Sequence, residues 1–495
     1  MNCQKHKIDS SIVGLRYAKE DCPGLLPTNP TWTQIEFNEM SKFSPELTYE
    51  KRTPITPSRQ NQAGRVVDIT SGVGFTQDVT VDNCTDLLQG FMFAKAREKA
   101  TTKPLNGKKV KVSVEADGSL KLASAITVVA NDLVLLEGFT IPANNGVFVV
   151  EEVTGAVIKL TTVLKPDVSV NGAVTKVGVK ASCSFDVVDG LGELTIQNAD
   201  KLGLIVGEWI FIGGSSATVS LDSNKGFARI LEIQTGKLIL DKLWSSASEA
   251  PSKLIEIYMG TVIKNEEDPN LIITQSYQFE RTLGQVNGKT QAEYNIGAVA
   301  NELKLTVPTS SKATVEMNYV SMRNEVRSGE DGLKDGDRPK LTTSSTMVNT
   351  STDFHFINLS VLKANTVVPD SALFTYATDM DLSISNGVEP TKAIGVLGAF
   401  DTSSGNFDVT GSLTAYFTDV SIINSLLASK AVTLDFAIVI DGKACIYDVP
   451  LLNLGGGELT IEANQPIKIP VDLNASESYT GYTLMYVQFP FIPNI

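Results

Sequence analysis

The chain has 495 residues, which is too long for one hydrophobic core, so we expect about three or four domains. Hydrophobic residues make up 42% of the chain and charged residues 20%, as in folded soluble proteins. The formal net charge of -14 excludes a protein that wraps nucleic acid, because that task needs a basic face to displace counterions.

The cysteines indicate a reducing compartment. They are odd in number, lie far apart and show no C-x-x-C spacing, so we interpret them as free thiols of a protein made in a cytoplasm: Cys3, Cys22, Cys84, Cys183 and Cys445. No run approaches about 18 uninterrupted apolar residues, the length that a membrane-spanning helix needs. No apolar segment follows Met1 before the first acid, so we expect neither a signal peptide nor a membrane partner.

Residues 1–45 are predicted to form an N-terminal arm. Leu15-Arg16-Tyr17 and Trp32–Phe37 can pair as strands, while three prolines keep the chain between them irregular, namely Pro23, Pro27 and Pro30. We expect that an arm of this kind cannot bury itself.

Residues 46–106 and 251–325 are predicted to form one β-sandwich domain that a long insertion splits. The strand Gly72–Val79 leads into a short helix. Asp82 or Asn83 can cap that helix, and its apolar side chains fall on one inward face, namely Leu87, Leu88 and Phe91. Apolar alternation then predicts further strands around 293–305 and 314–319.

The insertion, residues 107–250, contains two predicted small β modules at about 107–180 and 181–250. Each follows the order strand, glycine turn, strand, glycine turn, strand, with turns such as Asn144-Asn145-Gly146 and Asn224-Lys225-Gly226. Because the modules repeat each other and not their host, we expect them to carry their own cores and to stand away from it. Such an insertion costs little, since closure entropy grows only with the logarithm of loop length.

Residues 326–365 are predicted to be a linker, because Ser328–Asp353 is polar and rich in Gly, Asp, Ser and Thr. Residues 366–495 are predicted to form a second β-sandwich with one helix, which Asp419 can cap. Asp441-Gly442 is typical of a hairpin turn. The predicted strands are Ile394–Phe400, Phe407–Phe417, Val432–Ile440, Ala444–Val449 and Ile467–Leu473.

The second unit repeats the first in order, spacing and turn chemistry. In both, a glycine and a phenylalanine precede an alternating strand, and a capped helix follows that strand. Glu293–Leu305 corresponds to Ile446–Ile461, and Thr314–Tyr319 to Ile467–Leu473. We therefore predict two copies of one sandwich domain; the alternative is that any two all-β domains look similar under period-two patterning.

No catalytic, cofactor-binding or metal-binding site is predicted. The chain has two histidines, His6 and His355, and neither has a partner at a metal-ligand spacing. Gly455-Gly456-Gly457 lacks the ending of a phosphate loop, and Glu330–Asp337 lacks the ordered spacing of a calcium loop, so a bend and a solvated linker are the better interpretations. The carboxylates of Asp78 and Asp82 remain a formal option for glycosidase chemistry. This pattern favours a structural or binding role over an enzyme.

The plan and several residues resemble the tail tube proteins of long-tailed bacteriophages. The resemblance covers most of the chain and rests on order and spacing: Tyr17-Ala18-Lys19-Glu20, the Gly72–Val79 strand before Leu87-Leu88, Glu137-Gly138-Phe139, Asn144-Asn145-Gly146, Tyr447-Asp448-Val449-Pro450, Asn464-Gln465-Pro466-Ile467 and Gly481-Tyr482-Thr483-Leu484. It implies an all-β fold in which each sandwich carries one helix and joins its inner sheet to those of its neighbours around a channel.

The resemblance also implies a function and partners. Rings of six such domains would stack into a tail tube that encloses the tape-measure protein, meets tail terminator and distal tail proteins, and conducts DNA through its lumen without specific binding. This chain departs from the usual single domain by carrying two, so three chains would complete a ring. The protein would be part of the virion, assembled in the host bacterial cytoplasm, with no cofactor.

Two other function classes remain open. One is a carbohydrate-binding or adhesive protein built from β modules, which the repeated insertion modules and the aromatic residues Trp209 and Trp244 favour. The other is an all-β hydrolase that uses carboxylate chemistry. Electron microscopy separates both classes from a tail tube protein, because only a tube protein forms uniform rings with a hole.

Overall fold

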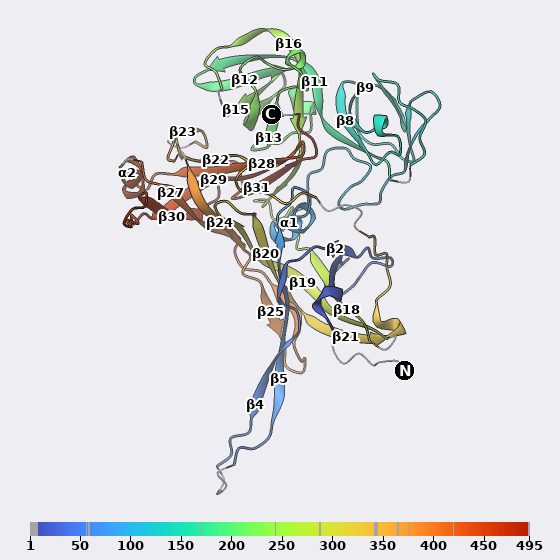
Figure 1. Ribbon diagram of the computed structural model, residues 1–495, viewed down its shortest axis with the longest axis vertical. Helices are drawn as coiled ribbons and strands as arrows, with labels where there is room; N and C mark the ends of the chain where they lie inside the picture. Colours follow the sequence, from blue (N-terminus) through green and yellow to red (C-terminus); the bar gives the residue numbers. More distant parts are fainter. Residues whose placement is uncertain are drawn as a thin grey trace.

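The computed structural model describes residues 8–493 except 56, 58–59, 170, 243, 287–288, 341–344, 364–365, 375 and 419. In this part the protein is built of β-strands with two short α-helices, α1 (Thr85–Phe91) and α2 (Ser421–Leu427). The predicted all-β class is confirmed. Figure 1 shows a long hairpin at one end of the molecule and the residues of the predicted insertion at the other.

The first half of the fold is a sandwich whose two sheets share strand β19. The first part of β19 lies between β18 and β21, and its last part pairs with β20. Rings from both sheets meet in the core; Phe279 of β18 lies 4.6 Å from Tyr319 of β20 between ring centroids. The strands are β1 (Gly14–Lys19), β2 (Thr33–Ile35), β3 (Glu39–Lys42), β4 (Glu46–Lys51), β5 (Gly64–Asp78), β18 (Ser276–Val286), β19 (Lys289–Val307), β20 (Thr314–Ser321) and β21 (Arg323–Gly329).

The second half shows a similar pattern of strand pairing. Its strands are β22 (Phe354–Leu362), β23 (Pro369–Ala372), β24 (Ala377–Ser385), β25 (Glu389–Lys392), β26 (Ala399–Ser403), β27 (Asp408–Tyr416), β28 (Val432–Ile440), β29 (Lys443–Gly456), β30 (Lys468–Ala475) and β31 (Met485–Phe489). Eight antiparallel pairings of the first half recur here in the same chain order. The corresponding strands are β1 and β22, β2 and β23, β3 and β24, β4 and β25, β18 and β28, β19 and β29, β20 and β30, and β21 and β31. Strand β5 corresponds to β26 and β27 together.

A direct strand pairing joins the two halves. The last part of β19 pairs with β24, from Glu302 opposite Ser385 to Val307 opposite Met380. Since β24 continues through β27 and β30 to the end of β29, one sheet runs through both halves. A second link is β17 (Thr261–Lys264), which pairs with β31.

The insertion forms a second, separate sheet of eleven strands. The long strand β11 belongs to both predicted modules, because it pairs with β8 through its first part and with β12 and β16 through its second. The strands are β6 (Val112–Val114), β7 (Leu120–Leu122), β8 (Asp132–Glu137), β9 (Gly146–Thr154), β10 (Val157–Leu160), β11 (Ala173–Val188), β12 (Leu191–Ile196), β13 (Trp209–Ile212), β14 (Gly226–Gln234), β15 (Lys237–Leu240) and β16 (Glu249–Met259).

The insertion does not stand away from its host, which corrects the sequence-based expectation. Each module has its own core, one around Leu136 and Val174 and one around Phe185 and Ile210. A third core is shared between the insertion and the second half, and contains Trp209, Phe211, Phe227 and Tyr258 together with Ile446, Tyr482, Val487 and Phe489. The insertion therefore covers the face of β28, β29 and β31 that points away from the sandwich core.

The predicted domain boundaries also differ from the structure. The predicted arm supplies β1, β2 and β3, and the expected pairing inside it is confirmed, with Leu15 opposite Ile35. It buries Leu15 and Tyr17 in the main core, because β18 gives it a sheet edge to join. Likewise, the predicted linker 326–365 contains β22, which pairs with β28.

Some predicted turns, strands and helix caps agree with the structure, and others do not. Asp441 and Gly442 both have positive φ and form the predicted turn between β28 and β29. The run Ile394–Phe400 is not a strand; β26 begins only at Ala399, and Ile394 is fully exposed in the β25–β26 connection. Helix α1 follows Cys84 without a side-chain cap, since Asn83 instead exchanges hydrogen bonds with Thr80. Asp419 lies outside the described residues.

Candidate assembly surfaces

One face of the sheet shared by both halves is polar and predominantly acidic. Cross-strand register places alternate residues of β5, β20, β19, β24, β27 and β30 on this face, while their neighbours, such as Met317 and Leu382, enter the core. Its acids are Glu39, Asp78, Glu302, Glu316, Asp379, Asp381, Asp408 and Asp472, and its lysines are Lys42, Lys304 and Lys468. We call this surface the polar face.

Both ends of the same sheet have an open edge. Strand β3 pairs with β5 on one side, and residues 453–456 of β29 pair with β30 on one side; within the described parts of the chain no strand occupies the other side of either. In the middle of the sheet the corresponding strands, β24 and β19, pair with each other. An open edge leaves backbone N–H and C=O groups ready for another strand.

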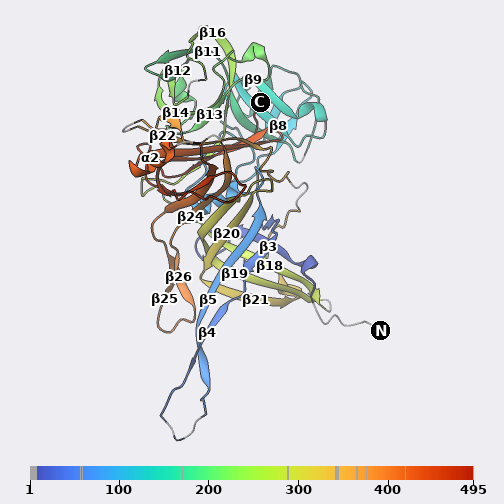
Figure 2. The same cartoon turned by 60° about the vertical axis from the view of Figure 1, so that its left-hand side comes forward.

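Two hairpins project from the sandwiches in the same direction (Figures 1 and 2). One consists of β4 and the first part of β5, and the other of β25 and β26. Lys392 forms an ion pair with Asp68 between the hairpins and lowers the pKa of that carboxyl. Both hairpins expose large apolar side chains: Leu47, Tyr49, Ile55, Val66, Val67, Ile394, Leu397 and Phe400.

The two helices are covered differently. Helix α1 is buried along its length, and the residues just before it receive contacts from the second half: Lys443 pairs with Asp82 at 2.8 Å, and Gln488 donates to the carbonyl of Val81 at 3.1 Å. Helix α2, in the corresponding position of the second half, leaves Val420 at its start 62% exposed and Leu427 at its end 80% exposed. Two exposed apolar side chains therefore remain at the ends of α2, whereas α1 exposes none.

A buried ion pair fixes the insertion on the second half. The Arg229 guanidinium donates to Asp448 Oδ1 at 3.0 Å and to the carbonyl of Val367 at 2.6 Å. Asp448 also accepts from Trp209 Nε1 and from the Tyr482 hydroxyl, each at 2.9 Å. Burial raises the pKa of Asp448, which Arg229 opposes; burial likewise opposes the charge on Arg229, but Asp448 and Asp241 outweigh it and hold the pKa of Arg229 above its usual range.

The residues considered for chemistry in the sequence are not brought together. His355 lies in β22, as predicted, and His6 lies outside the described residues. Asp78 pairs with Lys312 at 2.8 Å, while Asp82 pairs with Lys443. In the segment around Glu330–Asp337, backbone groups serve the fold; the carbonyl of Asp335 accepts from Trp32 Nε1. Gly456 and Gly457, both with positive φ, end β29 in the expected bend.

Other reactive groups of the described chain are also held in structural roles. Burial raises the pKa of the Cys84 and Cys183 thiols to about 12, which keeps them protonated. No group of three or more metal-ligating side chains occurs within the residues that the structure describes. In the same part of the chain, no helix has the length and apolar character needed to cross a membrane.

The most informative surfaces were missed by sequence reasoning. Strand β24 alternates Met380, Leu382 and Ile384 with polar residues, a signal that predicts a strand, but its pairing with β19 has no local sequence signature.

Comparison with known proteins agrees with an assembly role: a family model described as phage tail tube protein matches residues 10–475. No curated protein matches the chain.

Proposed function

This chain belongs to the phage tail tube protein family, a structural family and not an enzyme family, and from that premise we propose that three copies close into a ring with pseudo-sixfold symmetry. Stacked rings would form the tail tube of the virion. The observation that carries this proposal is the pairing of β19 with β24, because it joins two similar sandwiches through one continuous sheet within a single chain.

The free edges supply the contact between chains. In the proposed ring, β3 of one chain adds to residues 453–456 of β29 in the next, as β24 adds to β19 within a chain. Both junctions then have the same type, so the two tandem domains of three chains occupy six equivalent places. Ring closure leaves no open edge, which removes the aggregation hazard of a lone sheet.

The uneven cover of the helices supports the same contact. Within the chain, β29 and β31 of the second half contact the residues before α1. Their counterparts in the first half are β19 and β21, and β21 presents Val326, which is 74% exposed. We expect these strands of a neighbouring chain to cover the exposed side of α2, which would bury Val420 and Leu427.

The polar face is the proposed lining of the lumen. It is the wet side of the sheet that would close into a barrel, whereas the insertion covers the opposite side of the second half. Its excess of acids would repel DNA phosphates, so that DNA could pass without adhering. We propose that this lumen first encloses the tape-measure protein and later conducts the genome, and that the ends of the tube meet the tail terminator and distal tail proteins.

Axial stacking is assigned to the two hairpins. They project the same way, carry exposed apolar side chains and are linked by Lys392 and Asp68. The sheets are already occupied by lateral pairing, so a segment outside the sandwich must contact the next ring. The longer hairpin, made of β4 and the first part of β5, would reach furthest toward the next ring.

The ring is tested by measuring the mass and shape of the assembled protein. Purified full-length chain, made in a bacterial cytoplasm, should give rings of three chain masses with a central hole and stacked tubes in electron micrographs. A ring of six chains would overturn the pseudo-sixfold proposal. A protein that stays monomeric at high concentration would overturn self-assembly and favour the carbohydrate-binding alternative.

A further inference from the structure

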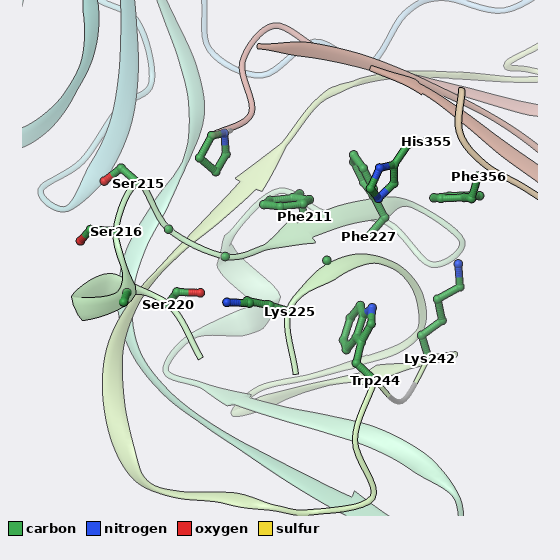
Figure 3. Close-up of a pocket in the computed structure, with 15 residues that line it drawn as sticks. Phe211, Ser215, Ser216, Ser220, Lys225, Phe227, Lys242, Trp244, His355 and Phe356 are labelled. Atoms are coloured by element: carbon green, nitrogen blue, oxygen red, sulfur yellow. The ribbon is translucent and has the colours of Figure 1, made fainter. Parts of the chain in front are cut away.

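A cavity of about 520 Å³ lies between the insertion and the second half, away from the surfaces assigned to assembly (Figure 3). The insertion contributes strands β13 and β14, the segment between them and residues that follow β15, and the second half contributes His355 and Phe356 of β22. Its volume falls within the range of about 300 to 1,000 Å³ that small-molecule sites occupy.

Flat rings form a continuous wall of this cavity. Phe227 lies at the centre of the wall, with ring centroids 4.9 Å from Phe211, 5.9 Å from His355 and 6.1 Å from Phe356. Trp244 lies beside Lys242, and Figure 3 shows its indole at the side of the same space. The three rings meet Phe227 edge to face, at interplanar angles of 66° to 68°, so this lining offers aromatic edges and faces to the apolar side of a ligand ring.

The charges that line the cavity are cationic. The lining includes Lys225 and Lys242 and contains no aspartate or glutamate, although the whole chain carries a net charge of -14. Lys242 is already compensated: its ammonium lies 3.6 Å from Asp435 and 4.4 Å from the centre of the Phe356 ring. It is therefore a fixed part of the wall.

Lys225 is the lining cation without an ion pair, although its charge, after that of Lys253, helps to lower the pKa of Asp222. Its side chain is exposed and forms no hydrogen bond or ion pair with another residue of the described chain, and in Figure 3 it extends into the cavity. Asp222, three residues earlier, is already paired with Lys253 at 2.8 Å. One available ammonium beside an aromatic wall matches a ligand with one negative charge and a flat body.

We propose that this cavity binds a carboxylate carried on a six-membered ring, with the ring against the aromatic wall and the carboxylate at Lys225. Two sources share this chemistry: an acidic sugar of the hexuronate type and an aromatic acid of the benzoate type. A phosphate monoester fits less well, because its second charge would face only the compensated Lys242. This site is independent of the proposed ring, since both walls come from one chain.

Tryptophan fluorescence provides the test. The chain has three tryptophans, and Trp32 and Trp209 are fully buried, whereas Trp244 is partly exposed at the cavity. The unassembled full-length protein is titrated with galacturonate and with benzoate, and with the uncharged analogues galactose and benzyl alcohol. We expect a saturable change in Trp244 emission with one or both acids, and at least about tenfold weaker binding of the uncharged analogues. The acid that binds more tightly identifies the source.

Charge variants decide whether Lys225 holds the carboxylate. Lys225→Ala should weaken binding about tenfold, and Lys225→Arg should retain it. Lys201→Ala, which removes another exposed lysine of the same module, should leave binding unchanged. The proposal is overturned if neither acid gives a saturable change, if the uncharged analogues bind equally well, or if Lys225→Ala binds like the parent. None of these results would bear on ring formation.

Discussion

Arg229 of the insertion and Asp448 of the second half form an ion pair of 3.0 Å with both side chains fully enclosed, although 219 residues separate them in the sequence. Charges without solvent are stable only when their remaining hydrogen-bonding groups are satisfied. Here Trp209, Tyr482 and the carbonyl of Val367 contribute hydrogen bonds, and the Asp241 carboxylate lies 3.5 Å from Arg229 Nε. The insertion is therefore attached by a specific polar contact as well as by a shared apolar core.

Removing one partner of this pair should destabilise the protein strongly. Asp448→Asn keeps the size of the side chain but leaves the buried Arg229 charge with Asp241 as its only close counter-ion, so we expect a loss of unfolding free energy that approaches the ~3 to 5 kcal/mol of a broken buried pair. Denaturant unfolding measures this loss. Glu193→Gln, which breaks the partly exposed pair of Lys237 and Glu193 in the same insertion, should cost less than about 1 kcal/mol. Equal losses in the two variants would contradict a special role for the buried pair.

Blocking β3 should stop ring closure without unfolding the chain. Proline at Glu39 and Ser41 removes backbone N–H groups from a strand that is mostly exposed in the single chain. The Glu39→Pro/Ser41→Pro variant should remain folded by circular dichroism and sediment as a monomer. The matched variant Glu39→Ala/Ser41→Ala retains those N–H groups and should assemble. Normal rings from the proline variant would show that β3 is not the joining edge.

A charge on the exposed side of α2 should also prevent assembly. Leu427 is 80% exposed in the single chain, so Leu427→Asp should leave the thermal midpoint of the monomer nearly unchanged. In a ring the same aspartate would be buried against a neighbouring chain without a partner, and light scattering should detect no rings. Val188→Asp introduces the same change at an exposed apolar residue of the insertion and should not affect assembly. If both variants assemble alike, α2 faces solvent in the ring.

Replacing residues 107–250 by a short Gly/Ser linker should yield insoluble protein. Sequence reasoning alone favours intact, thinner tubes, because each module was expected to carry its own core. The structure changes this expectation, since the deletion would expose apolar residues of the second half such as Ile446, Val487 and Phe489. The soluble fraction after expression measures the outcome, with the full chain as the control. Soluble tubes of reduced width would restore the earlier view.

The affinity of the cavity for a ring-borne carboxylate should rise on acidification. Burial, and then the charge of Lys242, lower the pKa of His355 below its ordinary value of about 6.5, so this imidazole is neutral at pH 7.5. Protonation at lower pH adds a cation while the ligand carboxylate stays ionised above about pH 5. Titrations over a series of pH values from 7.5 down to 5 should therefore show binding that tightens as His355 takes up its proton. His355→Asn should abolish this tightening, and an equal pH response in that variant would exclude His355 as its source.

The lowered pKa of His355 also affects the free energy of unfolding in a defined direction. A base whose folded-state pKa is depressed contributes stability that is fully present above its unfolded pKa. For His355 this contribution is present above about pH 6.5 and is lost as the pH falls through its folded-state pKa. Because the His355 side chain is only partly buried, solvent screening keeps the contribution small.

Local sequence signals predicted elements well, and failed where tertiary pairing decides. The Asp441-Gly442 turn and the inward Leu87, Leu88 and Phe91 of α1 follow from residue type and spacing alone. Ile394 is apolar yet exposed, because it lies in a projecting hairpin and not in a core. The pairing of β19 with β24 could not be predicted from the sequence, because hydrogen bonds between backbones impose little on the choice of side chains. Likewise, no local pattern around Arg229 indicates that Asp448 is its partner.

Covalent connection of the two halves changes how a ring would form from dilute chains. The edges of β19 and β24 are tethered by the residues between Val307 and Ala377, so they meet at an effective concentration set by the tether and not by the amount of protein. In the proposed ring, only the junction of β3 with β29 needs an encounter between molecules. Closure is then third order in chain concentration, whereas a ring of single-domain chains would be sixth order. Complete rings should accordingly appear at low expression levels, at which a six-chain ring would remain dissociated.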